Sequence, residues 1–356
     1  LGLPIPTIAC ASNGGVSVIH PNGSVTDVTH SGHYFEKVAF GSANKLWTQF
    51  TYSSGIDSRI ASLNVPYANT TAASSPTYYK SDTNIRLSKG AGNNHKIDSI
   101  ATTSDGLAAA DEAGGLTLLK HNDGNPAEGA VAYITSDYNT GYMLGDIRGA
   151  WLANNADDGT FSDRSVKGRH MAEQGTGVTA SAVATDAELK GYSGFTATDY
   201  IYGSHHADFD FGTGDWYYSF WAKVNSNSAI ETLISRGSAG AEYFNFYIQA
   251  NGIPQVVAYS SANTILYGDN AVDDGVWRKY DVFRRGATTY LYIDGVLHDT
   301  EAVAGDGDFT NTSAVLRIGI TFNTDLFATN SSLSLVRISA TAPTPQQVKE
   351  IYEAEK

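Results

Sequence analysis

The sequence has little charge and only one cysteine, and both shortages narrow the classes of protein to which it can belong. Charged residues make up 17% of the 356 residues, whereas an ordinary soluble domain carries about 25%. Cys10 has no second cysteine to bond with, so an intramolecular disulfide framework is excluded. Stability must therefore come from packed apolar side chains, and a chain of this length can bury a sizeable core.

Positive charge is scarce as well. Lys and Arg total 23 against 37 Asp and Glu, which gives a net charge of −14. This charge would repel a phosphate backbone and no Lys/Arg cluster offsets it, so we expect no binding of nucleic acid. No apolar run approaches the roughly 20 residues that cross a bilayer, so we expect no membrane insertion.

The start of the sequence lacks two further features. It opens as "LGLPIPTIAC", without an initiating Met and without the charged and apolar segments of a signal peptide. We therefore expect an N-terminal part of the protein to precede Leu1.

The residues that are abundant favour strands and turns. The chain contains 36 Gly and 21 Tyr, and Ser, Thr, Asn and Asp supply most of its polarity. Tyr, Thr and Val suit a pleated surface, whereas Gly, Asn and Asp suit tight turns. The composition predicts an all-β protein.

Residues 1–150 are predicted to form β-propeller-like blades. In residues 14–29, Val16 and Val18 alternate with polar residues before a Pro-Asn-Gly turn, which predicts a hairpin. A second strand pair is predicted in residues 35–50. The stretch "GGVSVIHPNG" has a later counterpart in "GGLTLLKHNDG", and such repetition is typical of propeller blades of about 40–50 residues.

The number of blades is the difficulty with this interpretation. Roughly 150 residues make about three blades, whereas a closed propeller has at least about four. Two explanations stay open: further blades lie in a preceding part of the chain, or several subunits close one ring.

Residues 151–162, "WLANNADDGTFS", are polar and contain Gly and Asp, which predicts a linker. The second predicted domain covers residues 163–356.

That domain is predicted to end in a short helix. Thr344 is a suitable N-cap and Pro345 suits the first helical position. Val348, Ile351 and Tyr352 would then share one face of the helix.

Several ordered motifs make residues 163–356 resemble the laminin-G-like, concanavalin A-like jelly-roll family. The motifs are "DRSVKGRH", "TDYIYGSHHADFDFGTGDWYYSFWAKV" and "DDGVWRKYDVFRRGATTYLYIDGVLHDT". The resemblance implies a sandwich of two antiparallel sheets, and residues 288–300 would supply a hairpin with a two-residue Asp-Gly turn. Residues 130–154 resemble virion-associated tail or fibre proteins of tailed bacteriophages.

Aromatic and amide side chains mark a candidate carbohydrate site. Sugar-binding sites combine aromatic platforms with side chains that hydrogen-bond hydroxyl groups. Most aromatic residues of a sandwich belong to its core, but "YSSANTILYGDN" reads as a polar, loop-like surface segment. Within it, Tyr259, Asn263 and Tyr267 are the predicted glycan-binding residues.

The family resemblance also implies calcium, which is held by carboxylate and carbonyl oxygens. Ser334 occupies the place where the family commonly has an Asp ligand, so the usual site is in doubt. The remaining candidate calcium ligands are four aspartates that the alternative interpretation treats as solvated loop residues: Asp199, Asp208, Asp210 and Asp215.

No catalytic motif stands out, since the sequence contains neither the Glu-x-Asp-x-x-Glu strand that the resemblance implies for glycosidases of this fold nor the nucleophile elbow of hydrolases. The first hypothesis is therefore a non-catalytic virion component, a tail-fibre or appendage protein that binds cell-surface or environmental polysaccharide. It would assemble with other virion proteins as a homotrimer, since avidity strengthens weak sugar contacts. Two alternatives stay open: an ancillary glycan-binding module of a polysaccharide-degrading enzyme, and a purely architectural decoration protein.

Overall fold

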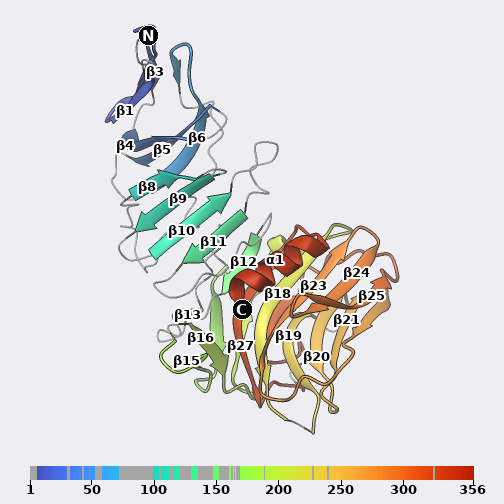
Figure 1. Ribbon diagram of the computed structural model, residues 1–356. Coiled ribbons are helices and arrows are strands. Elements are labelled where there is room, and N and C mark those ends of the chain that lie inside the picture. Colours follow the sequence, from blue (N-terminus) through green and yellow to red (C-terminus); the bar gives the residue numbers. More distant parts are fainter. Residues whose placement is uncertain are drawn as a thin grey trace. The chain divides into compact units, whose positions relative to one another are not determined.

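The computed structural model divides the chain into two compact units, Leu1–Ser136 and Asp137–Lys356 (Figure 1). The described residues are 6–29, 33–41, 44–52, 58–71, 99–103, 106–111, 115–120, 130–134, 147–151, 160–161, 163, 165, 169–187, 189–226, 228–238, 240–323 and 325–356.

The described residues of the first unit form three small sheets. One sheet contains β1 (Ile8–Ser12), β2 (Gly15–Ile19), β3 (Val25–Thr29) and β7 (Thr70–Thr71). A second contains β4 (His33–Phe40), β5 (Lys45–Tyr52) and β6 (Ser58–Asn64). The third contains β8 (Ser99–Thr102), β9 (Gly106–Asp111), β10 (Gly115–Lys120) and β11 (Ala130–Ile134).

Both predicted hairpins of this unit are confirmed. Strands β2 and β3 pair antiparallel with Val16 opposite Val28, and both valines are buried together with Val18. Strands β4 and β5 form the second antiparallel pair. The sheet β8–β11 is a four-stranded antiparallel meander, which is the composition of one propeller blade. The other two sheets differ from it, because β3 and β7 run parallel and β4–β6 has three strands; the propeller stays a prediction.

In its described residues, the second unit is a sandwich of two eight-stranded sheets. Sheet I consists of β12 (Ile147–Trp151), β15 (Thr179–Ala182), β16 (Lys190–Ser193), β18 (Trp216–Val224), β23 (Trp277–Arg285), β24 (Thr288–Ile293), β25 (Val296–Ala302) and β27 (Ser331–Ser339). Sheet II consists, in spatial order, of β13 (Thr160–Phe161), β14 (Met171–Gln174), β17 (Tyr200–Gly203), β26 (Val315–Ile318), β19 (Glu231–Gly237), β20 (Tyr243–Ile248), β21 (Pro254–Ser260) and β22 (Ala262–Tyr267).

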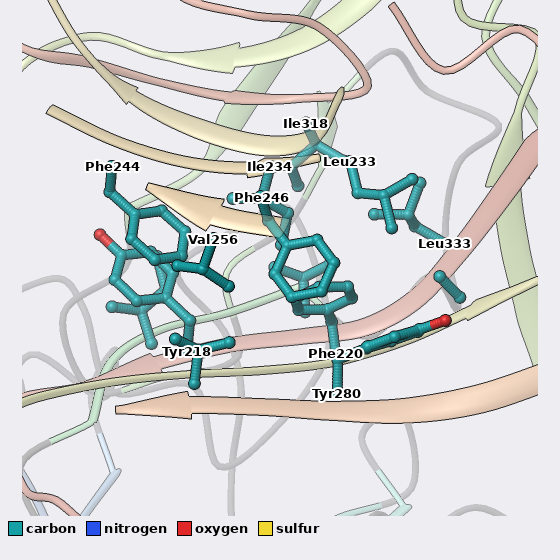
Figure 2. Close-up of a cluster of buried hydrophobic side chains, with 14 of the residues drawn as sticks. Tyr218, Phe220, Leu233, Ile234, Phe244, Phe246, Val256, Tyr280, Ile318 and Leu333 are labelled. Carbon is teal, nitrogen blue, oxygen red and sulfur yellow. The ribbon is translucent and has the colours of Figure 1, made fainter. Parts of the chain in front are cut away.

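The core lies between these two sheets, as the period-two alternation predicts. On β18, Trp216, Tyr218 and Phe220 belong to the core cluster. Figure 2 shows Tyr218 against Phe244 of sheet II, and the two rings stack with centroids 4.2 Å apart. Burial of such aromatic side chains contributes roughly 1.5–3 kcal/mol each, which supplies the stability that disulfides do not.

The hairpin predicted in residues 288–300 is confirmed. Strands β24 and β25 pair antiparallel, and Asp294 and Gly295 form the two-residue turn with φ values of 51° and 75°. Both values are positive, which suits a Gly and is tolerated by an Asp. On β24, Leu291 and Ile293 face the core, so the sandwich fold of this region is confirmed.

The C-terminal helix is also confirmed, as α1 (Pro345–Glu355). The Thr344 hydroxyl accepts a hydrogen bond from the Gln347 amide, and the Gln347 side chain accepts one from the Thr344 amide, which completes a capping box. Val348 joins a second apolar cluster with Tyr217 and Tyr292 on the outer face of sheet I. In the part of the chain that the structure describes, no helix has the length and apolarity to cross a bilayer.

The boundary between the units differs from the predicted one, because β12 belongs to the sandwich. The predicted first domain ended at residue 150 and the predicted linker covered residues 151–162, but β12 pairs with β27 near the C-terminus. The Trp151 side chain is fully buried, and its Nε1 donates to the Arg169 carbonyl at 3.0 Å. The sequence did not predict this pairing, because polar residues follow Trp151 and because the partner strand lies far along the chain.

Candidate ligand-binding face

The outer face of sheet II carries several aromatic side chains. On β20, Phe244 and Phe246 point into the core, so alternation places Tyr243, Asn245 and Tyr247 on the outer face. Their neighbours on β21 and β22 extend this face toward the edge of the sheet.

The first row of side chains across this face consists of Tyr243, Tyr259 and Asn263, which lie opposite one another on three adjacent strands. The rings of Tyr243 and Tyr259 stack with centroids 5.1 Å apart and an interplanar angle of 11°. The Tyr243 hydroxyl donates to Asn263 Oδ1 at 3.2 Å. This row therefore combines an aromatic platform with an adjacent amide.

The second row consists of Tyr247, Gln255 and Tyr267 on the same three strands. The Gln255 Nε2 donates to the Tyr267 hydroxyl at 3.0 Å, and 49% of Tyr267 is exposed. Tyr267 lies four positions after Asn263 along β22, which is a distance of about 13 Å. The two rows thus offer aromatic and polar groups at both ends of an extended face.

Between the two rows lies a third, which is more buried. It contains Arg317, Ser235 and Asn245, opposite one another on β26, β19 and β20. Ser235 donates to the Ile320 carbonyl at 2.8 Å, whereas the Oδ1 of Asn245 has no hydrogen-bond partner among the described residues. Only 1% of Asn245 is exposed.

The segment after β26 lies against this face. The ring of Phe322 lies 5.2 Å from that of Tyr243. Burial raises the pKa of Tyr247 to about 12, and the neighbouring Tyr243 and Asp325 add to the shift. The Tyr247 hydroxyl therefore stays protonated at neutral pH and remains able to donate a hydrogen bond.

All three predicted glycan-binding residues lie on this face. Their segment is not a loop as predicted, because Tyr259 belongs to β21 and Asn263 and Tyr267 belong to β22. The sequence pattern did not select Tyr243 and Tyr247, although the alternation of "YFNFYI" places them on one side of a strand. Only the strand order shows that this side meets Tyr259 and Asn263.

The four predicted calcium ligands are not gathered together. Among the described residues, no three His, Cys, Asp or Glu side chains form a group that could hold a metal ion. Asp199 instead accepts hydrogen bonds from the hydroxyls of Thr196 and Thr198 and from the amides of Thr176 and Gly177.

The other three aspartates have protein partners too. Asp215 accepts from the Gly286 amide at 2.8 Å. Asp208 pairs with Arg148 at 3.3 Å and with Arg169 at 2.6 Å.

Asp210 accepts from Arg236 and from the Asn311 amide, and His205 lies 2.9 Å away. The aspartates for which the sequence suggested calcium thus accept hydrogen bonds from cationic side chains or backbone amides. These donors come from distant parts of the chain, so only the tertiary structure shows the contacts.

The pH dependence of stability should reveal the contacts of Asp199. The hydroxyl of Thr196 is the main cause that lowers the pKa of Asp199 to about 2, followed by the Thr176 amide and the Thr198 hydroxyl. A lowered native pKa favours the folded state above pH 4 and loses this effect as pH falls from about 4 to 2. We expect Asp199→Asn to lower the melting temperature at pH 6 and to differ little from the unmodified chain at pH 2. A melting-temperature difference that is constant across this range would contradict the assignment.

The buried glutamate of sheet II has a structural contact. Glu231 accepts from the Asn330 amide at 3.0 Å and from the Ser331 hydroxyl. These hydrogen bonds connect the start of β19 to the start of β27.

Comparison with known proteins agrees with this fold. Residues 195–349 match the family model described as the concanavalin A-like lectin/glucanases superfamily. This match confirms the predicted resemblance over those residues. A search of curated proteins finds no match.

The comparison with solved structures finds further domains at low sequence identity. Domain 4 of AbnA, an extracellular arabinanase from Geobacillus stearothermophilus in complex with arabinotriose, is 16% identical, with a TM-score of 0.46 over 58% of this chain and 98% of that one. The binding domain of Paraclostridial Mosquitocidal Protein 1 is 15% identical, with a TM-score of 0.46 over 58% of this chain. The botulinum neurotoxin serotype D ligand-binding domain in complex with N-acetylneuraminic acid is 14% identical, with a TM-score of 0.47 over 58% of this chain. The chain spans 51% and 50% of these two toxin domains.

Proposed function

We propose that the second unit, whose residues 195–349 match the concanavalin A-like lectin/glucanases superfamily, binds carbohydrate on the outer face of sheet II without cleaving it. The observation that carries this proposal is the row formed by Tyr243, Tyr259 and Asn263, with its stacked rings and adjacent amide.

The chemistry of this row suits a sugar. The C–H face of a pyranose ring packs against an aromatic ring, while amide and hydroxyl groups bond its hydroxyls. Tyr267 and Gln255 repeat the same combination about 13 Å away. Two such places on one face favour an oligosaccharide or polysaccharide over a single sugar.

The biological setting that we propose is the virion of a tailed bacteriophage, where this protein would be a tail-fibre or appendage component. The resemblance of residues 130–154 to virion-associated proteins supports this setting. The ligand would then be cell-surface or environmental polysaccharide, and the partners would be other virion proteins. A homotrimer would strengthen attachment, because linked weak sites bind with avidity.

Binding measurements with single tyrosine variants test the proposal. We expect the full chain to bind at least one polysaccharide on a glycan array, and Tyr259→Ala to weaken that binding by roughly tenfold to a hundredfold, because a stacked aromatic anchor contributes about 1–3 kcal/mol. Tyr67→Ala is a matched control, since Tyr67 lies in the first unit and is 76% exposed. Absence of binding to any glycan, or full affinity in Tyr259→Ala, would refute the proposed site.

A further inference from the structure

The part of the third row that lies on β21 and β22 is apolar. Val257 and Ile265 lie opposite one another there, and Val257 also lies opposite Asn245 of β20. Asn245 and Val257 are buried, whereas Ile265 is half-buried and reaches the surface. A molecule that lies along β22 between the first and second rows would therefore meet the Ile265 side chain, and no hydrogen-bonding side chain, on the way.

The polar groups that a ligand can reach lie at the two ends of this path. In the first row, Asn263 is exposed and its Oδ1 accepts from the Tyr243 hydroxyl, which leaves the amide nitrogen to donate. In the second row, the Tyr267 hydroxyl accepts from Gln255 and keeps its own hydrogen to donate. Each end thus offers an aromatic ring together with an accessible donor.

The spacing of the two ends sets the length of a ligand that meets both. They lie about 13 Å apart along β22, which exceeds the length of one sugar ring. A chain that reaches both ends contains at least about three linked rings, since the path along a strand is nearly straight. The ring in the middle would place its apolar C–H face against Ile265, because only apolar contact is offered there.

The charges around this path favour a neutral ligand. The outward positions of β20, β21 and β22 carry no charged residue; they are Tyr243, Asn245, Tyr247, Gln255, Val257, Tyr259, Asn263, Ile265 and Tyr267. The charged neighbours at the second row are acidic, because Asp325 adds to the pKa shift of Tyr247 and Asp299 accepts from the Tyr267 amide at 2.8 Å. Arg317 of the third row is separated from β20 by β19. An acidic sugar on β20–β22 would be repelled by these carboxylates, whereas a neutral sugar would not.

We propose that this face binds a neutral, linear glycan chain that lies along β22 and reaches both rows at once. This inference rests on the proposed carbohydrate binding and adds the charge, the shape and the minimum length of the ligand. One ring of the chain packs against Tyr259 beside Asn263, another meets Tyr267 beside Gln255, and the ring between them contacts Ile265. Two weak contacts made by one chain bind with avidity, so the affinity should rise with chain length until the chain spans both rows.

The test measures affinity against chain length. The probes are size-fractionated oligosaccharides of one to six rings from cellulose, xylan, mannan and galactan, each titrated into the full chain by calorimetry, with polygalacturonate as the acidic comparison. In at least one neutral series, we expect the hexasaccharide to bind roughly tenfold to a hundredfold more tightly than the disaccharide, because the second contact is made within one complex. Polygalacturonate should bind more weakly than that hexasaccharide.

Variants of Tyr267 complete the test. We expect Tyr267→Ala to lower the affinity for the hexasaccharide to that of the disaccharide on the unmodified chain, because the second contact is lost. Tyr267→Phe should give an intermediate affinity, since the ring remains and only the hydroxyl is removed. Tyr67→Ala is the control, because Tyr67 is 76% exposed and lies in the first unit. Melting temperatures show that each variant is folded.

The outcomes separate this inference from the function on which it rests. If the disaccharide and hexasaccharide bind equally in every neutral series, if none of these series binds, or if folded Tyr267→Ala keeps the gain with length, the inference is overturned and carbohydrate binding at the first row still stands. Tighter binding of polygalacturonate than of every neutral chain overturns it as well. Absence of binding to every glycan on an array overturns both. A gain with length that is lost in Tyr267→Ala and kept in Tyr67→Ala supports the inference.

Discussion

Replacement of Arg337 by methionine is expected to lower the free energy of unfolding of the second unit by about 3–5 kcal/mol, the usual effect of removing one partner of a buried ion pair. Arg337 lies on β27 and Glu355 on α1, and their side chains are 3% and 0% exposed. The Arg337 Nη2 donates to Glu355 Oε2 at 2.8 Å, and the Trp221 Nε1 donates to the same oxygen at 2.8 Å. Without Arg337, the Glu355 carboxylate would be buried beside sheet I with no counter-ion of its own.

The double variant Arg337→Met/Glu355→Gln provides the control. It removes both charges, so the uncompensated buried carboxylate is absent and we expect most of the lost stability to return. Urea unfolding of the full chain, followed by tryptophan fluorescence, measures both effects, since Trp151, Trp216, Trp221 and Trp277 report on the second unit. A loss below about 1 kcal/mol in Arg337→Met alone, the level of an exposed ion pair, would contradict the assignment.

Replacement of Asp163 by alanine is expected to cost about 3 kcal/mol or more. Asp163 is 1% exposed and accepts hydrogen bonds from the amides of Ala150, Ser165 and Arg169 at 2.7, 2.8 and 2.6 Å. The Ser165 hydroxyl donates to it as well, at 2.7 Å. Each buried donor that loses its acceptor costs about 1–3 kcal/mol. Asp163 also binds β12 to the following segment, so its loss should release that edge of sheet I.

Asp163→Asn is the matched variant. It keeps the shape and one acceptor oxygen, so we expect a smaller loss of stability than in Asp163→Ala. Both variants should also differ from the unmodified chain in the pH dependence of their stability. Burial raises the pKa of Asp163 in the folded state. This shift stabilises the folded state at low pH, and the stabilisation is lost as pH rises through the native pKa. Unfolding free energies measured from pH 4 to 8 should therefore decline less with pH in Asp163→Asn. Equal losses in both variants would contradict the role of Asp163 as a hydrogen-bond acceptor.

This aspartate shows what the family resemblance alone does not explain. The motif "DRSVKGRH" was one of those that carry the resemblance, and the structure shows contacts among its described residues. Asp163 accepts from Ser165 and Arg169 of the same motif, and its own amide donates to His170 Nδ1 at 3.1 Å. The motif is a local structure that closes on β12, and we assign it no part in ligand binding.

Features that depend on neighbouring residues were predictable from the sequence. The period-two alternation put Trp216, Tyr218 and Phe220 on one face of their strand, the Asp-Gly pair placed the turn after β24, and Thr344 with Pro345 placed the start of α1. Each of these follows from backbone geometry within a few residues of chain. The glycan-binding candidates Tyr259, Asn263 and Tyr267 lie on one face because aromatic and amide residues are dense in their segment, and their role stays a prediction.

Features that depend on strand order were not predictable in the same way. Trp151 is part of the sandwich because β12 pairs with β27, and Asp208 and Asp210 form ion pairs because distant segments bring Arg148, Arg169 and Arg236 to them. The sequence determined which side chains each strand shows on either face, since alternation is local. Only the tertiary structure decided which of them meet, because in this fold hydrogen-bonded neighbours often lie far apart along the chain, as Ser235 of β19 and Arg317 of β26 do.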